Sequence, residues 1–336
     1  GSYTHNTEFF GPLLAVMEAR DLHDAIDLVN ATGYGLTSGL ESLDDREHEV
    51  WQRKIRAGNL YINRPTTGAI VLRQPFGGMG KSAIGPGIKA GGPNYVAQLM
   101  TFESRVSTAY SRAATQHTAG DENDLGDTGL DDFCEALRMA AARNAITVEE
   151  TEQIVVAAQS YEHWMAEEFD LVHDHFKLLG EDNFRRYLPL GEVRVRIHEQ
   201  DTAFEIFARA LASRSAGCRT VVSSPPDLQL PAVRLLDELT DSWAGAIEFV
   251  EESDADLAQA LREGHVERLR FANPQRVPFV LRTAAAANGE YIADESVSTH
   301  GRVELLWYFH EQSLTHVYHR YGNLGARIDE VRSPVE

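Results

Sequence analysis

Near the start of the chain, a continuous run of hydrophobic residues is followed by hydrophobic residues at helical spacing. The apolar run 12–17 predicts a short buried strand. Asp21 then precedes apolar side chains that return every three or four residues, which predicts a helix capped by Asp21 and ended by Asn30 and Gly33. This alternation is typical of α/β structure.

A second helix is predicted over residues 44–55, and Gly58 ends it. The next residues, 59–63, predict a strand. A loop with seven glycines follows between Gly68 and Gly91. Because glycine allows close approach to a backbone, we expect this loop to lie against something.

The hydrophobic pattern changes twice in the rest of the chain. Residues 130–179 contain neither Gly nor Pro and predict two or three helices. Residues 192–197 then alternate between apolar and charged side chains, which predicts a strand, followed by a helix from Asp201 to Gly217 and a strand at 219–223. The same alternation continues with a helix at 231–239, a strand at 246–250 and a helix at 254–263. Such βαβ repetition predicts a parallel sheet.

The tail, 301–336, is predicted to begin with a helix that carries Leu305, Leu306, Tyr308 and Phe309.

Composition narrows the class of protein. The 336 residues are 43% hydrophobic and 24% charged, which is typical of globular chains with two or three domains. The net charge of −20 argues against a nucleic acid partner. No run approaches the roughly 18 apolar residues that span a bilayer, and the first ten residues do not resemble a secretory signal. Two cysteines cannot build a disulfide framework, so we expect a cytoplasmic protein; peripheral membrane contact through a longer protein stays open.

Charge also divides the chain. Residues 1–104 hold 11 acidic and 9 basic side chains, whereas the remainder holds 40 and 22. The boundary lies close to residues 111–132, which are rich in Ala, Thr, Gly, Asp and Asn and predict an exposed linker.

Several short motifs occur together in residues 1–104. Residues 8–12 read Glu-Phe-Phe-Gly-Pro and resemble the E-x-F-G-P motif of NAD(P)-dependent aldehyde dehydrogenases. Further segments, in the same order and spacing, resemble the L-glutamate γ-semialdehyde dehydrogenase branch of that family: 58–64, 67–71, 74–82, and 85–86 with 89–93. The resemblance implies that residues 1–104 are the C-terminal part of an aldehyde dehydrogenase catalytic domain.

The tail carries a second resemblance. Residues 301–306, 311–313 and 318–325 resemble the C-terminal motif of long bifunctional proline utilization A proteins. That resemblance implies a linker and helical segment at 105–189, a degenerate aldehyde-dehydrogenase-like Rossmann domain at 190–298, and a C-terminal docking motif at 299–336. It also implies a flavin-dependent proline dehydrogenase domain, with FAD, outside this chain. No G-x-G-x-x-G is present in the second domain, so we expect no cofactor there.

The resemblance assigns cofactor residues. Glu8 and Phe10 occupy the positions that bind the nicotinamide ribose and pack near the nicotinamide ring of NAD. The chemistry agrees, because a carboxylate offers two acceptor oxygens to a vicinal diol and a fixed ring restricts the hydride-accepting carbon. The alternative interpretation is that Glu8 is a surface acid and Phe10 an ordinary core residue. NAD and NADP are not distinguished.

The same resemblance assigns substrate residues. Backbone N–H groups of Gly68 and Ala69 would hold the α-carboxylate of the substrate, and Phe76 would pack on its methylenes. Gly68 is physically suitable because no side chain blocks the approach to the backbone donors. Arg73 is an alternative partner for the anion. A glycine-rich turn with a buried Phe76 is the interpretation without a function.

The family mechanism needs a cysteine thiolate and a glutamate base, and the resemblance places both before the E-x-F-G-P motif. Cys134 stands among three acids and Cys218 at a helix-to-strand turn, so both are interpreted as structural. We therefore expect no catalytic residue in this chain and no activity from it alone.

Histidines raise a metal hypothesis. His163, His173 and His175 lie near acidic side chains, and His163 with Glu167 has an i, i+4 spacing. A solvated helix face explains them better, because no metal signature is present, and no metal is expected. The tail histidines, His310, His316 and His319, are assigned packing roles, while its aromatic residues 307–309, 318 and 321 predict a docking surface.

Three functions remain open at this point. The first is part of a dehydrogenase that oxidises L-glutamate γ-semialdehyde to L-glutamate with NAD in proline catabolism, with the missing N-terminal part of the same protein and further copies of it as partners. The second is a non-catalytic lid and assembly module of that protein. The third is a monofunctional aldehyde dehydrogenase with a C-terminal extension.

Overall fold

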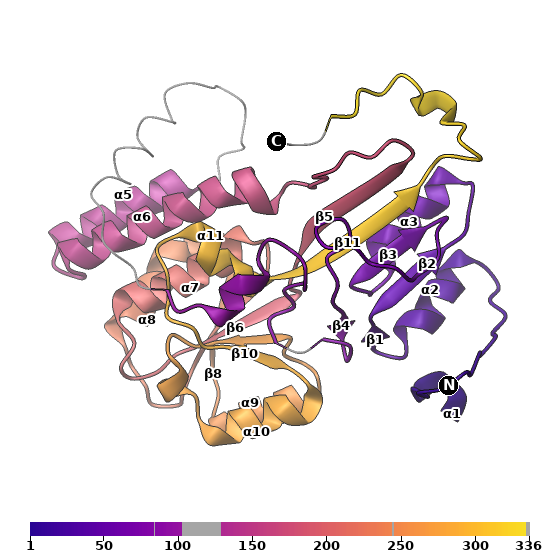
Figure 1. The fold of residues 1–336 in the computed structure, drawn as a ribbon. Coiled ribbons are helices and arrows are strands. Elements are labelled where there is room, and N and C mark those ends of the chain that lie inside the picture. The colour runs from indigo at the N-terminus through magenta and orange to yellow at the C-terminus, as the bar shows by residue number, and fades with distance from the viewer. Residues whose placement is uncertain (84, 103–128, 244, 334–336) are drawn as a thin grey trace. The chain divides into compact units, whose positions relative to one another are not determined.

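Segments that are far apart in sequence make up each of the two units of this protein. A computed structural model describes residues 1–83, 85–102, 129–243 and 245–333 (Figure 1). Unit 1 consists of Gly1–Tyr95, Val172–Arg186 and His310–Glu336, and unit 2 of Val96–Leu171 and Tyr187–Phe309. This grouping differs from the sequential division into 1–104, 105–189, 190–298 and 299–336, which stays a prediction.

Unit 1 contains a four-stranded sheet in the order β2-β3-β11-β5. The strands are β2 (Thr37–Leu40), β3 (Asn59–Ile62), β11 (Phe309–Val317) and β5 (Glu181–Pro189). β3 runs parallel to both β2 and β11, with Asn59 opposite Ser313. Two short strands, β1 (Tyr34–Gly35) and β4 (Met79–Gly80), form a separate antiparallel pair. The C-terminal strand is therefore built into the sheet of the N-terminal segment.

The predicted helices of unit 1 are confirmed. α2 spans Leu22–Asn30, and the Asp21 side chain accepts a hydrogen bond from the backbone N–H of Asp24. α3 spans Asp45–Lys54 and is capped by Asp44. Both helices contribute to one apolar core with β3 and β11, formed by Ile26, Trp51, Ile55, Ala57, Leu60, Ile62 and Leu314.

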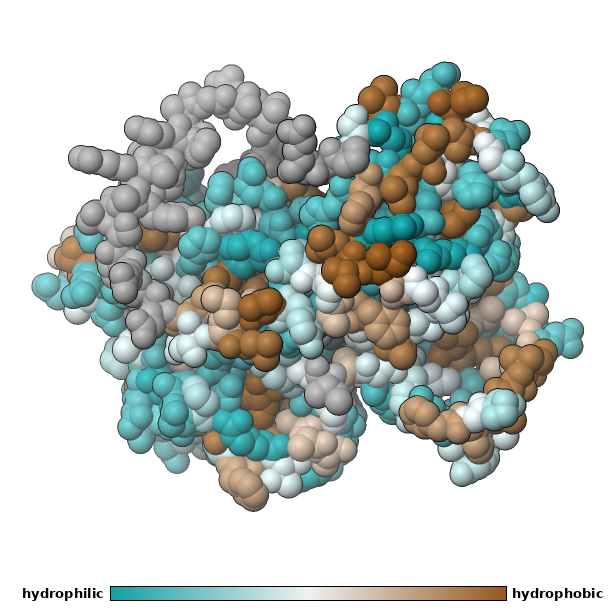
Figure 2. Space-filling model, viewed as in Figure 1, coloured by the Kyte–Doolittle hydropathy of each residue, from teal (hydrophilic) through white to brown (hydrophobic). Residues whose placement is uncertain are grey.

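The strand predicted at residues 12–17 is wrong. After the short helix α1 (Tyr3–Asn6), the chain runs without regular structure to α2. Apolar side chains of this segment are exposed, 84% for Leu14 and 84% for Val16, and Figure 2 shows hydrophobic atoms along it at the lower right. An apolar run becomes a strand only where another strand supplies hydrogen bonds, and no described strand pairs with this one.

Unit 2 contains a five-stranded sheet in which all four neighbouring pairs are parallel, as predicted. Its order is β10-β9-β6-β7-β8. The strands are β6 (Glu192–Arg196), β7 (Arg219–Ser224), β8 (Ile247–Glu251), β9 (Arg268–Arg270) and β10 (Tyr291–Ala293). The helices between them are α7 (Ala203–Ser215), α8 (Pro231–Thr240), α9 (Asp254–Arg262) and α10 (Phe279–Asn288). The strand order reverses between β6 and β9, which is the doubly wound Rossmann topology.

Helices α5 (Leu130–Ala142) and α6 (Val148–Trp164) belong to unit 2, and a π-helical turn continues α6 over Met165–Phe169. The prediction of helix as far as Leu179 is wrong beyond Phe169. The Asp174 carboxylate accepts hydrogen bonds from the backbone N–H groups of Phe176 and Lys177, which favours a turn over a helix. Of the predicted linker 111–132, residues 111–128 lie outside the described residues, and Leu130–Asp132 begin α5.

The tail begins with a helix that is shorter than predicted. α11 spans Gly301–Glu304, a 3₁₀ turn spans Leu305–Tyr308, and β11 follows. Trp307, Tyr308 and Phe309 are buried, whereas Tyr321 is fully exposed, and the docking surface stays a prediction. The apolar side chains of this turn are needed in the core of unit 2.

A buried ion pair joins α11 to the sheet of unit 2. Arg270 and Glu304 have fully buried side chains, and Arg270 Nη2 lies 2.8 Å from Glu304 Oε1. The Tyr308 hydroxyl donates to the same oxygen at 3.0 Å, and the Ser298 N–H donates to Glu304 Oε2 at 2.9 Å. Burial disfavours the cation, but Glu304 together with Tyr308 and Glu295 acts in the opposite direction, and the pKa of Arg270 is raised. The Arg270 guanidinium is therefore held in the core by a counter-charge and by hydrogen bonds.

Candidate active site

The residues predicted to bind substrate lie in one exposed loop that follows β3. Gly68 has φ +78°, and its carbonyl accepts a hydrogen bond from Arg64 Nη2 at 3.2 Å. The backbone N–H groups of Gly68 and Ala69 have no acceptor among the residues that the structure describes, and both residues are exposed. Two adjacent N–H groups are thus free to bind an anion from solvent.

A single carboxylate from β5 anchors this loop. Glu181 Oε1 accepts from Arg64 at 3.1 Å, from Arg73 at 2.7 Å and from the side-chain amide of Gln74 at 3.3 Å. Because two guanidinium groups share one carboxylate, the cluster carries a net positive charge. The alternative role of Arg73 as the direct anion partner is less favourable, since its guanidinium is already engaged by Glu181.

Phe76 lies at the other end of the loop. It forms an isolated antiparallel bridge with Ala90, and its side chain is 38% exposed. The Leu72 N–H also donates to the Gly91 carbonyl at 2.8 Å. The segment around Ala90 therefore holds the loop along its length, and Phe76 is not the buried residue of an ordinary turn.

Glu8 and Phe10 are both exposed, Phe10 to 97%. No hydrogen bond or ring contact joins either residue to the loop of Gly68 within the described part of unit 1. The structure thus brings Gly68, Ala69 and Phe76 into one loop but leaves the two predicted cofactor residues on a separate, open segment.

Both cysteines are buried. Cys134 is 2% exposed and Cys218 is 6% exposed. Burial raises the pKa of Cys134 to about 11 and that of Cys218 to about 12. A thiol in either environment is a poor nucleophile at neutral pH.

The histidines that raised a metal hypothesis are not gathered into a site. The rings of His173 and His175 stack at 6.1 Å, and His163 packs against Trp164. Within the described ranges, no group of three or more His, Cys, Asp or Glu side chains is placed to hold a metal ion. No described helix is long and apolar enough to cross a membrane.

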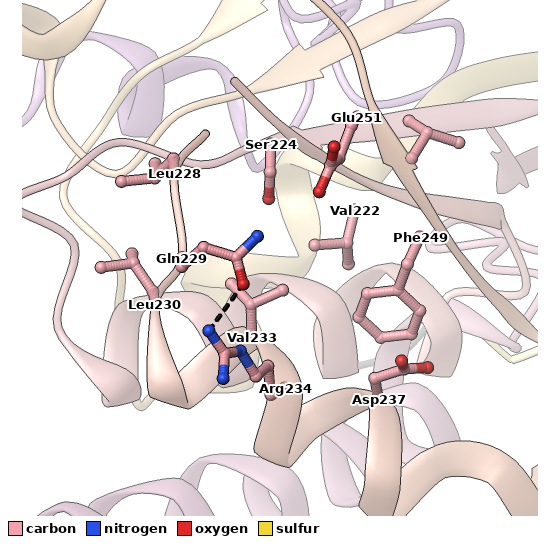
Figure 3. A pocket seen from close by; sticks show the side chains of 11 residues that line it. Val222, Ser224, Leu228, Gln229, Leu230, Val233, Arg234, Asp237, Phe249 and Glu251 are labelled. Atoms are coloured by element: carbon pink, nitrogen blue, oxygen red, sulfur yellow. Dashed lines mark hydrogen bonds between the residues drawn. The ribbon is translucent and has the colours of Figure 1, made fainter. Parts of the chain in front are cut away.

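Unit 2 has a cavity of about 220 Å³ at the carboxyl ends of β7 and β8, against α8 (Figure 3). Its wall combines apolar residues such as Val222 and Phe249 with the acidic residues Asp237 and Glu251. None of the predicted site residues lines it. The cavity and the loop of Gly68 belong to different units and are independent features.

The crevice at which strand order reverses in unit 2 is occupied by an arginine. Arg209 is fully buried, and its Nη1 donates to the carbonyls of Arg196 and Arg270 at 2.9 and 3.1 Å, at the ends of β6 and β9. Asp201 pairs with Arg209 at 2.6 Å and with Arg276 at 2.7 Å. These side chains occupy the place where a Rossmann fold ordinarily receives a pyrophosphate.

Comparison with known proteins identifies the first part of the chain. The family model "Aldehyde dehydrogenase family" matches residues 2–104. These residues are thus similar to an aldehyde dehydrogenase domain. This finding confirms the resemblance drawn from the motifs of that segment.

The relatives extend beyond that segment. The chain is 34% identical over 295 residues to "Bifunctional protein PutA" of Rhizobium meliloti, covering 84% of this chain and 21% of the relative. It is 46% identical over 103 residues to "1-pyrroline-5-carboxylate dehydrogenase 2" of Halalkalibacterium halodurans, covering 31% of this chain and 19% of the relative. The solved structure of Proline Utilization A from Corynebacterium freiburgense matches 96% of this chain and 27% of its own, with a TM-score of 0.63 and 31% identity. The chain spans about a fifth of the length of these curated relatives.

Sequence reasoning missed one residue of the loop's support. Glu181 lies more than 100 positions from Arg73 and Gln74, in a strand that the hydrophobic pattern did not predict. No local signal in the sequence connects them. Only the tertiary structure shows that Glu181 lies beside the basic residues of the loop.

Proposed function

We propose that this chain is the C-terminal part of an NAD-dependent L-glutamate γ-semialdehyde dehydrogenase of proline catabolism, within a longer bifunctional protein. One observation carries the proposal: the free N–H groups of Gly68 and Ala69 belong to the same loop as Arg64 and Arg73, which share the Glu181 carboxylate, in the segment that matches the aldehyde dehydrogenase family. The names of the relatives, a bifunctional PutA and a 1-pyrroline-5-carboxylate dehydrogenase, support the substrate and pathway.

The loop suits one end of this substrate. Its α-carboxylate would accept hydrogen bonds from Gly68 and Ala69, while Arg64 and Arg73 favour the anion without direct contact. Phe76 would pack on the methylenes between the carboxylate and the aldehyde. Binding at this end fixes the distance of the aldehyde carbon from the reacting groups.

The exposed Glu8 and Phe10 fit a nicotinamide nucleotide. The exposed Glu8 carboxylate would accept hydrogen bonds from two ribose hydroxyls. The almost fully exposed Phe10 would pack near the nicotinamide ring. NAD⁺, when bound, accepts the hydride of the aldehyde. Water supplies the second oxygen of the new carboxylate, and two protons are released.

The thiolate and general base of this reaction are proposed to lie outside this chain, since both of its cysteines are buried with raised pKa values. Unit 2 is proposed to be a degenerate Rossmann domain without a dinucleotide, because Arg209 fills the crevice. FAD is proposed only for a proline dehydrogenase domain elsewhere in the protein. We further propose that the protein assembles into a homo-oligomer and is cytoplasmic.

Substituting Gly68 with Leu in the full-length enzyme should raise the KM for glutamate semialdehyde about tenfold or more, since one charge-assisted hydrogen bond contributes about 1.5–3 kcal/mol. The KM for NAD⁺ should stay within about twofold. Steady-state kinetics with each substrate varied in turn measures both. The reaction is followed by NADH absorbance.

The matched control is Gly289→Leu. Gly289 has φ +75° and nothing within 4 Å of a Cβ, so it shares the left-handed backbone and open surroundings of Gly68 but caps α10 in unit 2. It should leave both KM values unchanged. Equal changes in the two KM values for Gly68→Leu would refute the assignment of the anion site.

The purified 336-residue chain alone should neither oxidise glutamate semialdehyde nor bind NAD⁺ measurably. NADH absorbance and calorimetric titration with NAD⁺ test the two statements. Aldehyde oxidation by the isolated chain would show that one of its own cysteines is the nucleophile. NAD⁺ binding without activity, abolished by substitutions in unit 2, would contradict the degenerate Rossmann domain.

A further inference from the structure

Asn59, the first residue of β3, brackets the backbone on both sides of Phe76. Asn59 is 1% exposed. Its Nδ2 donates to the Pro75 carbonyl at 3.0 Å, and its Oδ1 accepts from the Gly77 N–H at 3.1 Å. One side chain thus forms hydrogen bonds with the peptide groups on both sides of Phe76, the residue that would contact substrate.

Phe76 itself is bonded through both of its backbone groups. Its N–H donates to the Ala90 carbonyl at 2.8 Å, and the Ala90 N–H donates back to the Phe76 carbonyl at 2.9 Å. The side-chain nitrogen of Lys89, the residue before Ala90, donates to the Gly77 carbonyl. The backbone polar groups from the Pro75 carbonyl to the Gly77 carbonyl are therefore all paired, while Phe76 as a residue is 38% exposed.

Lys89 is a buried hydrogen-bond donor to this segment. Its side chain is fully buried, and its Nζ also lies 3.4 Å from Asn59 Oδ1. Burial lowers the pKa of Lys89 to about 7, with Glu311 acting in the opposite direction. An amine that sheds its charge near neutrality can bond a carbonyl in the core at a smaller desolvation cost.

The C-terminal strand completes this arrangement. Ser313 of β11 lies opposite Asn59, and its hydroxyl donates to the Pro75 carbonyl at 2.6 Å. Glu311, 2% exposed, accepts from the Lys89 backbone N–H at 3.1 Å and from Asn94 at 2.5 Å. Residues from β3, from the glycine-rich loop and from β11 converge on one three-residue segment.

We infer that Asn59, Lys89 and Ser313 are positioning residues that fix Phe76 against the methylenes of the substrate, so that strand β11 sets the specificity of the aldehyde site. The inference rests on the proposed function. The hydrogen bonds hold five consecutive backbone groups, from the Pro75 carbonyl to the Gly77 carbonyl, around one partly exposed residue, and side chains of β3, β11 and Lys89 supply several of them. Fixing these groups before binding removes the entropy cost of ordering Phe76 on the substrate.

The test uses the full-length enzyme and three single variants. Phe76→Ala should raise the KM for glutamate semialdehyde about tenfold, Asn59→Ala about as much, and Ser313→Ala about threefold. The KM for NAD⁺ should not change in any of them. Ser313→Ala removes only one hydroxyl, so it keeps the inference testable if Asn59→Ala does not fold.

A double-mutant cycle separates an effect that acts through the position of Phe76 from a general loss of structure around the site. A residue that acts through Phe76 should have no further effect on KM once Phe76 is Ala, so Ser313→Ala should be silent in the Phe76→Ala enzyme. Asn30→Ala is the matched control. Asn30 brackets backbone in the same way, donating to the Lys54 carbonyl and accepting from the Arg56 N–H, both at 2.9 Å, but at the end of α2. It should leave the semialdehyde KM unchanged.

The outcomes are distinguishable. If the wild-type enzyme does not oxidise glutamate semialdehyde with NAD⁺, the proposed function fails. If it does, and Phe76→Ala raises KM while both Asn59→Ala and Ser313→Ala leave it unchanged, the proposed function stands and the positioning inference is overturned. A fully additive cycle, or an unchanged KM in Phe76→Ala, also overturns it.

Discussion

Replacing Glu304 with Gln should lower the free energy of unfolding of unit 2 by about 3–5 kcal/mol, because it leaves the charge of Arg270 in the core without its counter-charge. Both side chains are fully buried, and Tyr308 and Ser298 also donate to this carboxylate. Amide hydrogen exchange of β9 in the full chain measures the loss locally. This readout avoids assuming that the two units unfold together.

The control for Glu304→Gln is an exposed pair of the same unit. Arg282 and Asp294 lie 2.8 Å apart with side chains 43% and 19% exposed, so Asp294→Asn should cost less than about 1 kcal/mol. Similar losses in the two variants would show that burial does not decide the strength of the Arg270 pair.

Replacing Gly58 with Ala should destabilise unit 1 by about 3 kcal/mol or more, through overpacking. A Cβ on Gly58 would overlap the Gly77 carbonyl oxygen and lie 2.5 Å from Lys89 Nζ. The first of these neighbours is backbone and cannot rotate away. Thermal unfolding of the full chain, with hydrogen exchange of β3 as the local probe, measures the effect.

Gly11→Ala is the matched control for Gly58→Ala, because nothing lies within 4 Å of a Cβ at Gly11 and neither glycine has a positive φ. It should change the stability of unit 1 by less than about 0.5 kcal/mol. A Gly58→Ala variant as stable as the wild type would mean that the Gly77 segment moves freely, which would also weaken the positioning of Phe76.

Helix boundaries were predictable where a capping residue precedes the helix. Asp21 and Asp44 accept hydrogen bonds from the first turns of α2 and α3, as their positions before helical spacing indicated. The parallel sheet of unit 2 was predictable for a similar reason. Its central strands carry β-branched apolar residues, Val193 and Val195 in β6 and Val221 and Val222 in β7, and helices with clear apolar spacing follow each of them.

Strands β5 and β11 could not be predicted, because both bury polar side chains. In β5, Asp182 is buried against Arg327 and Arg332 from the tail. In β11, Glu311, Gln312 and Thr315 are buried although their side chains are polar. A pattern that equates burial with apolar residues fails where the partners of a strand are charged or amide groups from distant segments.

The candidate site was predictable only in part for the same reason. Gly68, Ala69 and Phe76 followed from a resemblance carried by consecutive motifs. Asn59 and Lys89 stood inside those motifs without an assigned role, since their roles depend on Gly77 and Pro75 lying beside β3. The contribution of Ser313 depends on a pairing between residues at opposite ends of the chain.

The pairing of β11 with β3 has a consequence for biosynthesis. Gln312 bonds Ala57 across 255 positions of sequence, and a ribosome that adds roughly 5–20 residues per second takes about 13–50 s to supply the second partner after the first. During that interval one edge of β3 emerges from the ribosome without its neighbour, while the sheet of unit 2 already has all its strands before β11 is complete. Edges left open in this way recruit other chains, so the nascent polypeptide is a natural client for a chaperone until its last strand arrives.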